Sequence, residues 1–109
     1  MSINVNVLSD TALEAAVAAA KGHAKDMKAY LEQRAIIFAE GAAALVKDRL
    51  SGAIDDSDVR FAWEEIQAAE ESARLAIKVT AKAALQDAIN GALAVVKGAV
   101  NQAVGIKLI

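Results

Sequence analysis

Residues 51–57, SGAIDDS, form the clearest predicted turn in this 109-residue chain. Gly52 suits the position just after a helix, where a left-handed backbone is common, and Asp56 or Ser57 can cap a following helix. Both flanks favour helix, because the chain has no proline and is rich in alanine, the strongest helix former. The turn therefore predicts an all-α fold, in one domain of residues 1–109, built on a long antiparallel helical hairpin.

Before the turn, residues 11–50 predict one continuous helix. Apolar side chains recur at steps of three and four residues along the whole stretch. Only Gly22 and Gly41 interrupt it, each at a cost of about 1 kcal/mol in helix propensity. Such a helix of about 40 residues would be roughly 60 Å long.

Residues 1–10, MSINVNVLSD, are expected to form an extended leader. Apolar and polar side chains alternate there at Ile3, Val5 and Val7, a pattern typical of a short strand. The stretch lacks the basic and apolar regions of a secretory signal, so a cytoplasmic location is the default expectation.

After the turn, residues 58–104 predict a second helix whose apolar side changes direction. Up to Leu85 apolar and charged side chains occupy opposite sides of the helix, and beyond Leu85 they exchange places. Either the helix continues and uses opposite faces for different neighbours, or it breaks at Asn90 and Gly91 and a third C-terminal helix follows. The exchange begins before the Asn-Gly pair, which favours the continuous helix.

The last 21 residues, 89–109, have the length of a membrane span but not its composition. Lys97 at the centre costs about 2.5–3.5 kcal/mol for insertion, while each aliphatic residue returns only about 0.3–0.6 kcal/mol. The polar residues Asn90, Lys97 and Asn101 share one narrow side, opposite a broad apolar face. The tail is therefore predicted to be an amphipathic helix that needs a partner for its apolar face.

The predicted hairpin carries more apolar surface than it can cover. Burying seven of the large aliphatic residues of the tail, from Ile89 to Ile106, is worth on the order of 10 kcal/mol, which rivals the whole stability of a small domain. We therefore expect a homo-oligomer, with a dimer favoured, that completes a four-helix-type bundle. The expected interface residues are Ile36, Ile37, Trp63, Ile89, Leu93, Val96, Val100 and Val104.

Two charged residues fall on apolar sides and are candidates for a buried ion pair. Arg49 lies on the apolar stripe of the first predicted helix, and Glu65 lies on the apolar side of the second. A pair between them, within or between subunits, would satisfy both charges and fix the register of the helices. The alternative is that both long side chains reach water.

The sequence offers no catalytic or metal-binding set. It has no cysteine, and its single histidine, His23, has no Glu-x-x-His partner. The paired carboxylates Glu64–Glu65 and Glu70–Glu71 fall mainly on the charged face and are expected to be solvated. A net charge of −2 and a pI near 5.3 argue against nucleic-acid binding.

These observations favour a non-enzymatic, self-associating helical protein without a cofactor, acting as a scaffold, an adaptor or a small structural subunit. A further protein partner is compatible with the surplus apolar surface. One alternative is a protein whose amphipathic tail lies on a membrane or lipid surface, although the tail has no aromatic residue to anchor it. Another is a small-ligand carrier with a pocket between helices.

Overall fold

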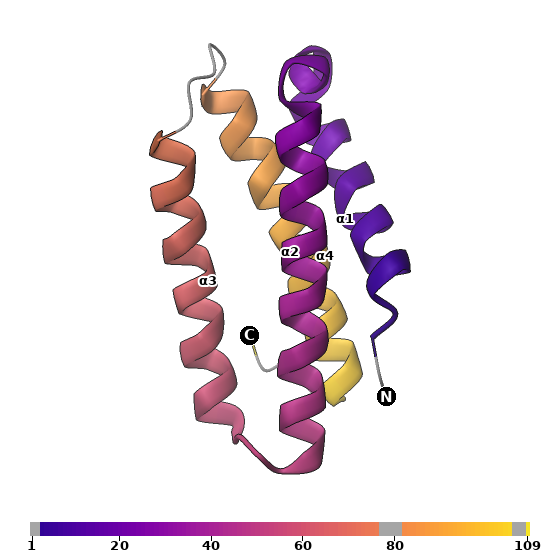
Figure 1. The fold of residues 1–109 in the computed structure, drawn as a ribbon, viewed down its shortest axis with the longest axis vertical. Coiled ribbons are helices and arrows are strands. Elements are labelled where there is room, and N and C mark those ends of the chain that lie inside the picture. The colour runs from indigo at the N-terminus through magenta and orange to yellow at the C-terminus, as the bar shows by residue number, and fades with distance from the viewer. Residues whose placement is uncertain (1–2, 77–81, 106–108) are drawn as a thin grey trace.

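The computed structural model describes residues 3–76, 82–105 and 109, and these residues form an all-α fold (Figure 1). The described helices are α1 (Val5–Ala20), α2 (Ala24–Ser51), α3 (Asp56–Ala76) and α4 (Lys82–Val104), with a 3-10 turn at Lys21–His23 between α1 and α2. Successive helices run in opposite directions. The predicted all-α class is confirmed, and none of these helices is both long and apolar enough to cross a membrane.

The expected extended leader is wrong, because α1 begins at Val5. The side-chain oxygen of Asn4 accepts a hydrogen bond from the backbone N–H of Val7 at 3.1 Å and so caps the helix. Ile3 and Val5 are half-buried and pack against the core, whereas Val7 points outward. The apolar alternation therefore reflects the first turn of a helix rather than a strand.

The predicted helix over residues 11–50 is divided at Lys21–His23, where the chain reverses so that α2 packs along α1. Lys21 has φ 55° and ψ −127°, and its N–H donates to the carbonyl of Ala18. Buried residues continue at helical spacing on both sides of the turn, with Ala16 and Ala20 before it and Met27 after it. Because α1 and α2 face the same core, the spacing of apolar side chains continues through the turn and does not reveal the reversal.

The predicted turn is present over residues 52–55. Gly52 ends α2 with φ 83°, in the left-handed region, as its sequence position indicated. The cap of α3 is Asp55, one or two residues earlier than expected. Asp55 accepts a hydrogen bond from the N–H of Asp58 at 2.9 Å, and Asp58 accepts one from the N–H of Asp55 at 3.1 Å. This reciprocal arrangement is a capping box with aspartate in both positions.

The second predicted helix is two helices, and the change of apolar direction at Leu85 falls in the first turn of α4 rather than at the reversal itself. Val59 and Trp63 on α3 and Leu85 and Ile89 on α4 are buried in the core. The two helices run in opposite directions beside it. The reversal falls between Ala76 and Lys82, and residues 77–81 lie outside the described part of the chain. Asn90 and Gly91 lie within α4, so a break at that pair is also wrong.

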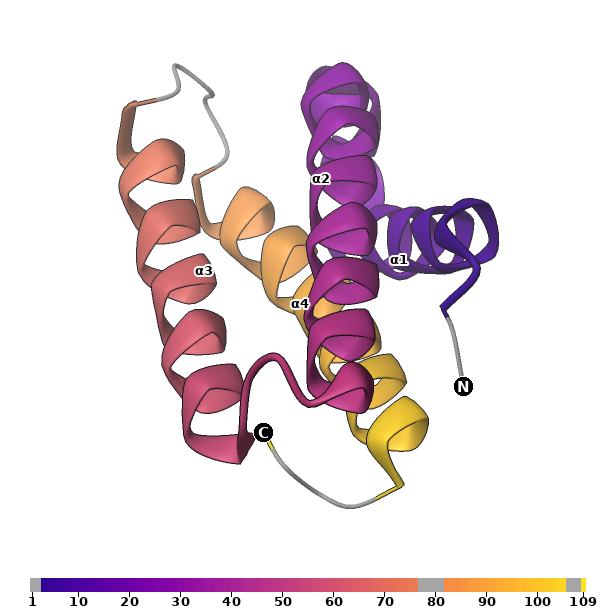
Figure 2. The same cartoon turned by 60° about the horizontal axis from the view of Figure 1, so that its bottom comes forward.

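The core lies among α1, α2 and α4, which approach one another closely, whereas α3 stands further off (Figure 2). Small residues permit the close approach: a Cβ added to Gly91 would lie 3.1 Å from the carbonyl oxygen of Ala15 on α1. The largest fully buried apolar side chains are Leu31, Val46, Val59, Leu85, Ile89, Val96 and Val100. A single copy of the chain thus covers most of its own core.

Candidate functional site

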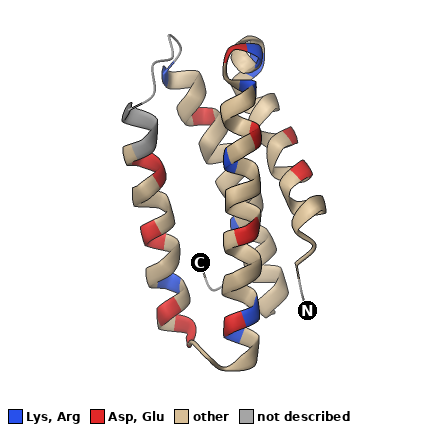
Figure 3. Ribbon diagram, viewed as in Figure 1, with Lys and Arg blue, Asp and Glu red and all other residues tan. Residues whose placement is uncertain are grey.

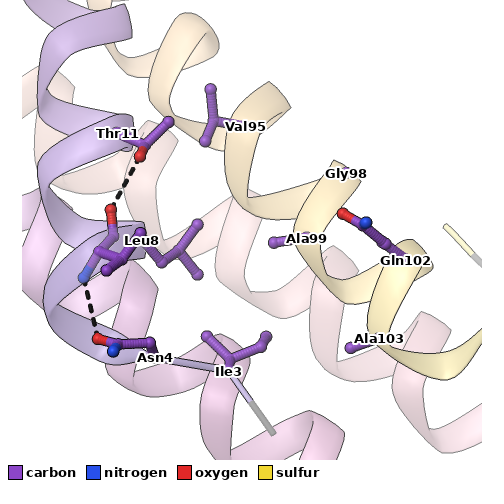
Figure 4. A pocket seen from close by; sticks show the side chains of 10 residues that line it. Ile3, Asn4, Leu8, Thr11, Val95, Gly98, Ala99, Gln102 and Ala103 are labelled. Atoms are coloured by element: carbon purple, nitrogen blue, oxygen red, sulfur yellow. Dashed lines mark hydrogen bonds between the residues drawn. The ribbon is translucent and has the colours of Figure 1, made fainter. Parts of the chain in front are cut away.

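A groove between the start of α1 and the end of α4 is the candidate functional site (Figure 4). It has a volume of about 490 Å³. Ten residues, none of them charged, line this α1–α4 groove: Ile3, Asn4, Val7, Leu8, Thr11, Val95, Gly98, Ala99, Gln102 and Ala103. Leu8 is buried, whereas Val7 is 61% exposed. The groove therefore presents a mostly apolar, uncharged surface with an exposed valine beside it.

The polar groups on the α1 side of this groove are engaged within their own helix. The side chain of Asn4 caps α1, and the hydroxyl of Thr11 donates to the carbonyl of Val7 at 2.8 Å (Figure 4). Gly98 on the opposite wall adds no side chain, and a Cβ placed there would meet nothing within 4 Å. The arrangement suits an apolar occupant, and the described residues hold no cluster of carboxylates and histidines that could ligate a metal ion.

A second notable feature is the buried carboxylate of Glu70 on α3, which is 1% exposed. The hydroxyl of Tyr30 donates to Oε1 at 2.9 Å, and Nε of Arg34 donates to Oε2 at 2.8 Å. The Arg34 guanidinium also lies 5.6 Å from the centre of the Phe38 ring. These bonds fasten α3 to α2, because a buried carboxylate is stable only when it is paired and hydrogen-bonded.

The expectation that Glu70 is solvated is wrong, because its side chain lies on the buried side of α3 together with Trp63. Trp63 is 4% exposed. Val59, Trp63 and Glu70 follow one another at steps of four and seven residues, so they share one side of α3. Trp63 marks the inner side of α3, and the helical spacing of seven residues places Glu70 on that same side.

The predicted interface residues divide into two groups. Trp63, Ile89, Leu93, Val96 and Val100 are buried within the chain itself, so their assignment to a subunit interface is corrected. Other helices of the same chain cover these residues, so they do not need a partner to be buried. The remaining three differ: Val104 is half-buried against the core, while Ile36 and Ile37 on α2 are 47% and 43% exposed.

The predicted pair between Arg49 and Glu65 does not form within the chain. Arg49 instead donates from Nε to the carboxylate of Asp56 across the turn between α2 and α3. Glu65 is exposed, because it lies on the side of α3 turned away from Trp63. The partner of Arg49 is therefore an acid seven residues away in the sequence, on the other side of the turn.

Comparison with known proteins gives no match, whether to a protein-family model, to a curated protein or to a solved structure.

Proposed function

We propose that this protein is a non-enzymatic helical protein that self-associates as a two-fold dimer through the α1–α4 groove, serving as a small structural or adaptor subunit. The observation that carries the proposal is the uncharged groove with the exposed side chain of Val7 beside it. A contiguous apolar surface of this kind is typical of an interaction site.

A second copy of the chain fits this groove better than a charged partner does. In a two-fold dimer the same patch serves both subunits, so it must be complementary to itself. The α1–α4 groove combines a hollow with the exposed side chain of Val7. None of its lining residues is charged, so two facing grooves would not repel each other. Acidic residues predominate along the described part of α3 (Figure 3), so facing copies would repel each other there.

The exposed residues Ile36 and Ile37 on α2 offer a competing surface for self-association. Both side chains are close to half exposed and carry no charge. A dimer built on α2 instead would bury this pair and leave the α1–α4 groove open. Val7 would be buried in a dimer built on the α1–α4 groove and exposed in a dimer built on α2. A single substitution of Val7 therefore distinguishes the two arrangements.

The test is sedimentation velocity at micromolar concentrations on the wild type, Val7→Glu, Ile37→Glu and Phe61→Glu. Val7 and Phe61 are matched in exposure, at 61% and 63%, but lie on different helices. Glutamate at position 7 falls in the first turn of α1, where it favours the helix, so the monomer should stay folded. We expect a dimer for the wild type and Phe61→Glu, and about tenfold or greater weakening for Val7→Glu.

Two results would contradict this proposal. A wild type that is monomeric throughout the concentration series would remove self-association altogether. A dimer that survives Val7→Glu but dissociates in Ile37→Glu would place the interface on α2. Circular dichroism of each variant, expected to match that of the wild type, separates loss of association from loss of folding.

A further inference from the structure

Two adjoining hollows lie between α3 and α4, on the side of α4 away from the α1–α4 groove. Their volumes are about 310 Å³ and 250 Å³, and both are lined by Gln67, Asn90 and Leu93. They exist because α3 stands away from its neighbours, held by long side chains rather than by close helix packing. We call the two hollows together the α3–α4 groove.

The α3–α4 groove combines an apolar floor with polar walls. Trp63, Ile89 and Leu93 are 4%, 1% and 8% exposed and form the floor. The amide side chains of Gln67 and Asn90, which can both donate and accept hydrogen bonds, belong to the walls. An apolar pocket with a few convergent polar groups is the usual form of a small-molecule site.

Two hydrogen-bond donors at one end of this groove lack acceptors. The indole N–H of Trp63 is buried and has no hydrogen-bond partner among the described residues. Lys97 lines the same hollow and is half-buried as a residue, and no carboxylate of the described part of the chain lies within 4 Å of its ammonium. A buried donor without an acceptor is costly, and such groups commonly mark the place of an absent water or ion.

The opposite end of the groove is acidic. Glu70 and Glu71 line the hollow that lies further from Lys97. The Glu70 carboxylate is already neutralised by Arg34, whereas Glu71 is exposed. An anionic group entering the groove is therefore drawn toward Lys97 and kept away from Glu71, which gives a bound molecule one orientation.

We propose that the α3–α4 groove binds a small organic anion with a flat apolar body. The acid group pairs with Lys97, the apolar body packs on Trp63 and Leu93, and the amides of Gln67 and Asn90 hydrogen-bond its polar edge. This site is independent of the proposed dimer, because it uses other residues on another side of α4.

The test compares two dyes that differ by one charged group. The first, 8-anilinonaphthalene-1-sulfonate, is an anion, and N-phenyl-1-naphthylamine has the same rings without the sulfonate. The chain has one tryptophan, so its indole ¹H–¹⁵N resonance in an NMR spectrum reports on this groove alone. The dyes are titrated into the full-length wild type, Lys97→Gln and Lys47→Gln. Lys47 is an exposed lysine on α2 and provides the matched loss of charge.

We expect the sulfonate dye to shift the Trp63 indole resonance and to bind the wild type more tightly than the neutral dye. Lys97→Gln should weaken binding of the sulfonate dye by about tenfold and leave the neutral dye unchanged, whereas Lys47→Gln should change neither. The proposal is overturned if the indole resonance does not move on saturation. It is equally overturned if Lys97→Gln and Lys47→Gln bind the sulfonate dye alike, or if neither dye binds.

Discussion

Arg34 on α2 holds the buried carboxylate of Glu70 on α3, with Nε of Arg34 2.8 Å from Oε2 of Glu70. The two partners are unequal, because the side chain of Arg34 is 22% exposed and that of Glu70 only 1%. Arg34 can turn to water if it loses its partner, whereas Glu70 cannot. Because the two side chains differ in exposure, removing Arg34 and removing Glu70 should affect the docking of α3 differently. In the described part of the chain, α3 packs less closely on its neighbours than the other helices do.

Arg34→Met is expected to destabilise the protein by about 3 kcal/mol or more, because it leaves a buried carboxylate with only the hydroxyl of Tyr30. Glu70→Leu should cost less, since Arg34 then becomes solvated. The double variant should be more stable than Arg34→Met alone. Urea denaturation followed by circular dichroism measures all three, and a double variant less stable than Arg34→Met would contradict the assignment.

Lys21→Gly is expected to stabilise the protein by roughly 1 kcal/mol. Lys21 has φ 55° and ψ −127°, a conformation that glycine adopts without strain and other residues adopt at a cost. Gly22→Ala is the control, because Gly22 has no positive φ and a Cβ there meets nothing within 4 Å. A Lys21→Gly variant with a lower free energy of unfolding than the wild type would show that the chain does not reverse in this way.

Gly91→Ala and Gly41→Ala are expected to change stability in opposite directions. The Cβ at position 91 would lie 3.1 Å from the carbonyl oxygen of Ala15, so α1 and α4 must move apart, at a cost of about 1 kcal/mol or more. The Cβ at position 41 would lie 4.0 Å from Cδ1 of Ile66, an ordinary contact, and should gain about 0.5–1 kcal/mol in helix propensity. Chemical denaturation measures the free energy of unfolding of both variants. An equal increase in this free energy for Gly91→Ala and Gly41→Ala would argue against the close approach of α1 and α4.

Asp55 is expected to make stability depend on pH in the acid range. The hydrogen bond from the backbone N–H of Asp58 lowers the pKa of Asp55 below its usual 3.8. Because the folded-state pKa is lowered, the stabilisation is fully present above pH 3.8 and is lost as pH falls through the folded-state pKa. Asp55→Asn can keep the cap through its side-chain oxygen without titrating.

The measurement for Asp55 is the melting temperature of the wild type minus that of Asp55→Asn, followed from neutral pH to well below the pKa. This difference should fall as the carboxyl of Asp55 becomes protonated. A difference that stays constant over the whole range would mean that Asp55 does not cap α3.

Local signals predicted the helical class and the turn, while the two other reversals escaped them. Gly52 and the acidic residues after it mark the turn because left-handed glycine and side-chain caps are local features. The reversal at Lys21 is fixed by packing of α1 on α2, and the residue that takes the positive φ is the lysine rather than the adjacent Gly22. The sequence around Lys21 therefore gives no turn signal at the residue that matters.

The candidate sites were less predictable than the fold, because each depends on which helices become neighbours. The α1–α4 groove requires a helix where residues 1–10 were expected to be extended, and Asn4 is the cap that the alternating pattern concealed. The α3–α4 groove requires Trp63 and Glu70 to lie on the inner side of α3. That orientation follows from the partners Tyr30 and Arg34, which lie 40 and 36 residues away in the sequence.

The central claim, that two copies meet at the α1–α4 groove, is tested most directly by pairing single cysteines in a chain that has none. Val7→Cys and Gly98→Cys each place one thiol in the lining of the groove. When the two variants are mixed and mildly oxidised, we predict a disulfide-linked pair of the two different chains. Far less should form from Val7→Cys mixed with Phe61→Cys. Equal yields from both mixtures, or no linked pair from the first, would contradict the account.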